Sequence, residues 1–79
     1  MKLVSFEHCQ GYVFRLNFIN GETGEVDLSE LIGKYINLES INSARLDSDC
    51  GCLEFSGGMV DIEPKTLYQF AKTHGKLIN

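Results

Sequence analysis

The clearest pattern in the sequence is a segment in which large apolar side chains occupy every second position: Tyr12, Phe14, Leu16 and Phe18. A period of two predicts a β-strand with one buried, aromatic-rich face and a mostly polar outer face. The preceding segment Lys2–Cys9 predicts another strand, in which Val4 and Phe6 share one face. A turn at residues 9–11 would join the two strands.

The dipeptide Asn20-Gly21 follows the alternating segment directly. Both central residues of a type I′ turn need a positive φ, which Asn and Gly tolerate, so this dipeptide predicts a tight hairpin. A third strand is expected over Glu22–Val26, weakened or bulged at Gly24. Together these segments predict an antiparallel three-stranded meander.

The hydrophobic period changes at Asp27, from that of a strand to that of a helix. The stripe at i, i+3, i+4 and i+7 consists of Leu28, Leu31, Ile32 and Tyr35. Asp27 and Glu30 are spaced like a capping box, which predicts that the helix begins here. Gly33 lies inside the stripe, so we expect about two turns only. One further helical turn is expected at residues 40–44.

The remaining chain predicts short strands and one longer helix. Strands are expected at Arg45–Asp47 and Cys52–Phe55 around a turn at residues 49–51, and at residues 59–62 after the turn Gly57-Gly58. In the last strand the predicted inward residues are Val60 and Ile62.

The closing helix is expected to begin at Pro64, which suits the first helical position, and to end before Gly75. Its apolar stripe contains Leu67, Phe70, Ala71 and His74. Because a small domain rarely leaves an aromatic strand face in water, we expect Leu67 and Phe70 to be buried against it. The chain of 79 residues therefore predicts one α+β domain, with a meander, a short helix, two to three further short strands and a C-terminal helix packed on the sheet.

Charge and length restrict the classes of function. Eleven acidic and seven basic residues give a net charge of −4, and no two of the basic residues are adjacent in sequence. Because nucleic-acid binding depends on Lys and Arg that displace counterions from phosphate, this composition disfavours it. No apolar stretch approaches the roughly 20 residues needed to span a bilayer, so no membrane association is expected.

The N-terminus and the cysteines suggest a compartment. Glu7 interrupts the first residues before an apolar run of signal-peptide length is reached, so secretion is not expected. Three cysteines are an odd number, which argues against a disulfide framework and for free thiols. Free thiols are typical of a reducing cytoplasm. We therefore predict a cytoplasmic protein.

Cysteine and histidine suggest one alternative, a small metal-binding protein or enzyme that uses Cys9, Cys50, Cys52 and His8. However, Cys50-Gly51-Cys52 is tighter than the spacing of two to four residues usual in structural zinc sites. His8 and Cys9 would point to opposite faces of a strand. The sequence therefore favours free cysteines, and we predict no metal ligand, no cofactor and no catalytic residue.

The other polar candidates have structural interpretations. Asp61 and Glu63 precede the closing helix, where negative charge stabilises the helix N-terminus, and this capping role is favoured over acid–base catalysis. His74 lies in the last turn, where a cationic ring meets the helix dipole favourably.

Two blocks of sequence resemble a bacterial family known only as domain of unknown function 2442. The first block is Phe18–Gly21 followed by Val26–Leu28, and the second is Gly58–Tyr68, which resembles the closing signature G-x-D-(I/L)-x-P-x-x-L-Y of that family. Phe55-Ser56 departs from the family, in which many members have Trp-Pro or a similar pair. The resemblance implies a small α+β domain, in some members fused to a helix-turn-helix domain, and no established catalytic residues.

Stand-alone members of that family are often encoded beside another short protein, in a layout similar to toxin–antitoxin pairs. The resemblance therefore implies a non-catalytic protein-binding or regulatory module, antitoxin-like, whose partner is the neighbouring gene product. The sheet edges expected here would accept a strand of another chain. A nucleic-acid-binding regulator remains a further alternative, and the sequence leaves a homo-oligomer open.

Overall fold

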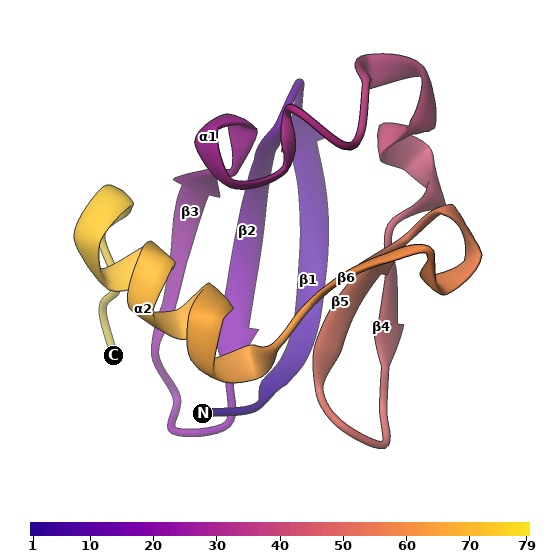
Figure 1. Ribbon diagram of the computed structural model, residues 1–79. Helices are drawn as coiled ribbons and strands as arrows, with labels where there is room; N and C mark the ends of the chain where they lie inside the picture. Colours follow the sequence, from indigo (N-terminus) through magenta and orange to yellow (C-terminus); the bar gives the residue numbers. More distant parts are fainter.

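The computed structural model describes residues 1–79 and contains two antiparallel sheets (Figure 1). Strands β1 (Leu3–Gln10), β2 (Val13–Phe18) and β3 (Thr23–Asp27) form the first sheet in the order β1-β2-β3. Strands β4 (Arg45–Asp47), β5 (Cys52–Phe55) and β6 (Val60–Ile62) form the second in the order β4-β5-β6. With the C-terminal helix α2 (Pro64–His74), these elements confirm the predicted α+β fold.

The alternating pattern of the second strand determines the centre of the core. Phe14 and Leu16 are fully buried and Phe18 is 2% exposed, while Arg15 points to solvent. The ring of Phe14 meets that of Phe55 from the second sheet edge-on, with 5.9 Å between centroids. The two sheets thus share one core, which also contains residues of the helices and of the segments beside α1: Leu28, Ile32, Ile36, Ile41, Leu67 and Ala71.

The prediction that Val4 and Phe6 share one face of β1 is wrong. The register of β1 against β2 shifts between Leu3 and Ser5, which is a β-bulge. This bulge changes the parity of the strand, so Leu3 lies opposite Phe18 and is buried, whereas Val4 is 48% exposed.

The turn between β2 and β3 also differs from the prediction. Gly21 has φ +90°, but Asn20 does not have a positive φ, so the turn is not type I′. The amide of Gly21 donates to the carbonyl of Phe18, and the amide of Phe18 donates to the carbonyl of Glu22. These bonds enclose a three-residue loop in which Gly21 occupies the left-handed position.

Helix α1 (Ser29–Ile32) is shorter than expected and is followed by the 3₁₀ helix η1 (Leu38–Ser43). Asp27 Oδ1 accepts the amide of Ser29 at 2.9 Å, which lowers the pKa of Asp27, but no capping box forms with Glu30. Because the helix ends before Gly33, the predicted stripe does not reach Tyr35, which is 68% exposed.

Helix α2 has the predicted bounds and lies across β2 and β3 (Figure 1). Leu67 and Ala71 are fully buried, but Phe70 is only half-buried and stacks on His74, so the prediction for Phe70 is wrong. Gly75 has no positive φ. A Cβ there would lie 2.6 Å from Val26 Cγ2, so the close approach of helix and strand requires glycine.

The turn Gly57-Gly58 is confirmed as part of the 3₁₀ helix η2 (Ser56–Gly58), which leads into β6. Figure 1 shows β6 crossing in front of β1 on its way to α2. Val60 is half-buried and Ile62 is 5% exposed, as the inward direction predicted for both requires. None of the helices combines the length and the apolar composition needed to cross a membrane.

Candidate protein-binding groove

A groove of about 260 Å³ lies where α1, β6 and the first turn of α2 meet. Five of its eight lining residues are hydrophobic. The lining residues are Leu31, Ile32, Tyr35, Val60, Asp61, Ile62, Glu63 and Thr66. A volume below the roughly 300–1,000 Å³ of small-molecule pockets suits one or two side chains of another protein better than a separate ligand.

The groove runs along the free edge of β6. Successive residues of a strand point to opposite faces, so Val60 and Ile62 lie on one face and Asp61 and Glu63 on the other. Residues of both sets line the same groove, as expected for a groove beside a strand edge. Since β6 pairs with β5 alone, its second edge has no strand neighbour.

The rim of the groove carries negative charge that the chain itself leaves unneutralised. Asp61 and Glu63 are exposed, and neither belongs to any of the ion pairs of the structure, which are Arg15–Glu25, Arg45–Glu54 and His74–Glu30. Glu63 is the N-cap residue of α2, but its side chain makes no capping hydrogen bond. The expected capping role thus involves no hydrogen bond from a helix amide to the Glu63 carboxylate, which remains free for an external cation.

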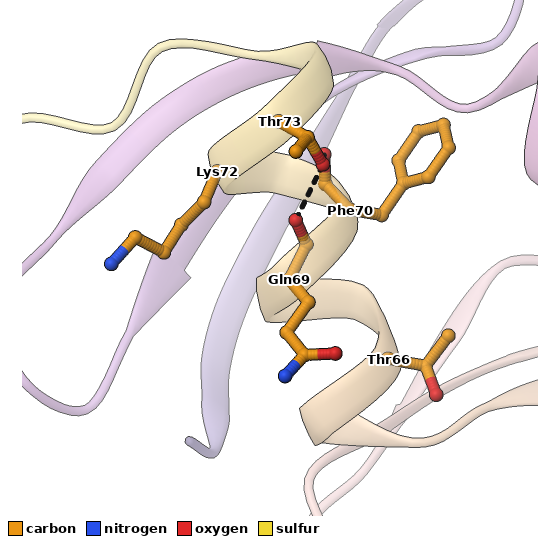
Figure 2. Close-up of a pocket in the computed structure, with 5 residues that line it drawn as sticks. All are labelled: Thr66, Gln69, Phe70, Lys72 and Thr73. Carbon is orange, nitrogen blue, oxygen red and sulfur yellow. Dashed lines mark hydrogen bonds between the residues drawn. The ribbon is translucent and has the colours of Figure 1, made fainter.

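A larger hollow of about 570 Å³ lies on the outer face of α2, but its residues do not form a site. Figure 2 shows that Gln69, Phe70 and Lys72 point away from one another. The hydroxyl of Thr73 donates to the carbonyl of Gln69 one turn earlier, at 2.7 Å, and so serves the helix itself. Divergent side chains on one convex helix cannot converge on a ligand, so the groove beside β6 is the better candidate.

Comparison with known proteins gives one match. The family model described as "Protein of unknown function (DUF2442)" matches residues 3–73. The chain belongs to this family. No curated protein and no solved structure matches it.

In this DUF2442 chain, the two sequence blocks that carried the resemblance are in contact. Tyr68, from the closing signature, meets the ring of Phe18 edge-on with 5.0 Å between centroids. Its hydroxyl donates a short hydrogen bond to Glu22 Oε1, directly after the turn, and the Asn20 amide donates to the same oxygen at 2.5 Å. These two hydrogen bonds lower the pKa of Glu22. The tyrosine of the signature therefore holds α2 to the β2–β3 turn.

The residues of the metal alternative are not brought together. The turn at Gly51 packs against Lys2 at the beginning of β1, whereas His8 and Cys9 lie six to seven residues further along the strand, about 20 Å away at 3.3 Å per residue. His8 Nε2 instead forms a hydrogen bond with the carbonyl of Gly11 at 2.8 Å. No three His, Cys, Asp or Glu residues are grouped so that they could hold a metal ion.

The expectation of three free cysteines is wrong. Cys50 and Cys52 form a disulfide, and only Cys9 is free. Gly51 has φ +76°, and this turn brings the two Cα atoms to 5.4 Å, within the range that a disulfide spans. An odd number of cysteines says nothing about such a local pair. The cytoplasmic prediction consequently loses the support that it took from free thiols.

Sequence reasoning also missed the groove itself. The alternation of Val60 and Ile62 with Asp61 and Glu63 was visible and correctly assigned to a strand. The position of this strand beside α1 was not visible, because the two elements are about thirty residues apart in sequence. The exposure of Tyr35, which lines the groove, followed from the early end of α1.

Proposed function

We propose that this chain is a non-catalytic protein-binding module, specifically the antitoxin-like half of a two-gene pair in the cytoplasm. The observation that supports a binding role is the unpaired edge of β6, with an apolar groove beside it and unneutralised carboxylates on its rim. Exposed sheet edges are common sites for a strand of another protein. The antitoxin-like role is supported by the gene layout that the family resemblance implies.

The chemistry of the groove fits binding better than catalysis. Its polar groups are two exposed carboxylates, the threonine hydroxyl and the hydroxyl of Tyr35, and its lining contains no histidine, cysteine or lysine. Carboxylates act as general bases when burial or a neighbouring charge tunes their pKa, but both carboxylates here are exposed. The threonine hydroxyl has no histidine in the lining that could activate it as a nucleophile.

Co-expression with the protein encoded by the neighbouring open reading frame tests this proposal. We expect the two chains to co-elute in gel filtration, and the growth defect caused by the neighbour alone to disappear when this chain is present. Separate elution, together with a neighbour that is harmless alone, would remove both parts of the proposal.

A further inference from the structure

We infer that the groove beside β6 binds an extended segment of a partner protein in which basic and apolar residues alternate. This inference rests on the proposed protein-binding function and adds the chemistry of the partner segment. The segment would add to the second sheet as a fourth strand, with its backbone paired to the free edge of β6.

Among the sheet edges, that of β6 is the one best suited to accept a strand. The outer edge of β3 is bridged by the chain's own C-terminal segment, since Thr23 and Ile78 exchange backbone hydrogen bonds of 2.8 and 2.9 Å. The edge of β1 has register irregularities at two points, and its first residues pack against the β4–β5 turn. Bulges of this kind protect an edge from pairing. Strand β4, the other outer strand of the second sheet, contacts β1, and residues of both strands line a smaller hollow of about 170 Å³. The larger groove, of about 260 Å³, lies beside β6, whose outer edge pairs with no strand.

The alternation in the partner follows from the alternation in β6. Side chains of neighbouring strands that share a face contact one another. Residues of the partner on the face of Val60 and Ile62 would enter the apolar part of the groove, beside Leu31. Residues on the opposite face would lie beside Asp61 and Glu63, where Lys or Arg supplies the missing positive charge.

A second copy of this chain fits the edge poorly. Pairing β6 with β6 of another copy would place Asp61 and Glu63 against the same carboxylates, and like charges on neighbouring strands are destabilising. The net charge of −4 also makes two copies of this chain repel each other. A basic partner is attracted by both features.

The test uses a seven-residue peptide in which Lys alternates with Val and Leu, titrated into the isotope-labelled full chain and followed by NMR. We expect saturable shifts of the amides of β6 and α1. Two N-methylated forms of the peptide, with methyl groups on the even or on the odd residues, test strand addition. Because alternate amides of a strand face each neighbour, only one of the two forms should lose binding.

Variants of the protein test the side-chain contacts. Asp61→Asn combined with Glu63→Gln should weaken peptide binding about two- to thirtyfold at low salt, as expected for two exposed ion pairs. The control Glu7→Gln with Asp49→Asn removes the same charge from exposed positions outside the groove and should change binding less than twofold. Tyr35→Ala, at a residue that is 68% exposed, should also weaken binding and leave the fold intact.

Five outcomes contradict the inference. Peptide shifts outside the groove, equal binding of both N-methylated forms, or equal effects of the groove and control variants would each overturn it. A homodimer that Tyr35→Ala dissociates would show that a second copy occupies the groove. If the neighbouring gene product co-elutes equally well with the groove variants, the inference fails while the protein-binding function stands; if it never co-elutes with the wild-type chain, the proposed function itself fails.

Discussion

Truncation of Leu67 to alanine should destabilise the protein far more than truncation of Phe70, although both residues belong to the apolar stripe of α2. Leu67 is fully buried in the shared core, whereas Phe70 is half-buried at its margin and stacks on His74, with 4.0 Å between the ring centroids. The comparison tests directly how α2 is rotated on the sheet.

The magnitudes follow from burial. Removing a fully buried leucine side chain costs about 2–5 kcal/mol, because apolar contacts are lost and a cavity remains. A fully buried phenylalanine would cost about 3–5 kcal/mol, but partial exposure and a surface neighbour reduce this to roughly 1–2 kcal/mol for Phe70. A chain of 79 residues has a total free energy of unfolding of about 4–12 kcal/mol. Leu67→Ala should therefore remove at least about a sixth of it.

Urea titration of both variants, followed by far-UV circular dichroism, gives the two free energies of unfolding. An unchanged dependence on urea concentration would show that the extent of unfolding is the same and that the comparison is valid. A loss for Phe70→Ala as large as that for Leu67→Ala would refute the orientation of α2 described above. It would mean that Phe70 reaches the core, as the sequence pattern had predicted.

Three further predictions concern the turn, the helix end and the carboxylates. Gly21→Val should cost about 1–3 kcal/mol in thermal or urea unfolding because its φ is positive, whereas Asn20→Val should lose only side-chain hydrogen bonds; equal losses would argue for a type I′ turn after all. Gly75→Ala should push the end of α2 away from Val26, because the new Cβ atom has no room there. Amide hydrogen exchange in the last turn of α2 should then become faster, and unchanged exchange would contradict the close contact. The pKa of Glu22 is lowered in the folded state, so its ionised carboxylate stabilises the fold at every pH above the ordinary glutamate pKa of about 4.3. This stabilisation is lost as the pH falls through the lowered pKa of the folded state. Tyr68→Phe should raise that pKa in an NMR titration and make unfolding less dependent on pH between about pH 5 and pH 2; an unchanged Glu22 pKa would show that the Tyr68 hydroxyl is not its donor.

Several elements could be predicted from the sequence because their signals are local. The alternation around Phe14 and Leu16 predicts a strand and its buried face, and Pro64 marks the beginning of α2. The bounds of β4 and β5 also agree with the turn-forming residues between them. In each case neighbouring residues determine the backbone conformation, so the pattern and the structure coincide.

The errors arose where a local pattern depended on a distant contact or on a single backbone dihedral. Because of the bulge at the start of β1, Leu3 lies opposite Phe18 and is buried in the core, and Val4 is exposed. The left-handed conformation of Gly51 joins two cysteines that the total number of cysteines had suggested were free. Neither feature changes the periodicity of the sequence.

The sequence by itself determined the α+β class, most of the elements and the buried face of β2. Only the tertiary structure decided that β6 lies beside α1, that its free edge borders a groove, and that Asp61 and Glu63 find no cation within the chain. The physical reason is that periodicity records whether a residue is buried. Which elements bury one another depends on the packing of side chains that are far apart in sequence, and a binding groove is formed by what that packing leaves uncovered.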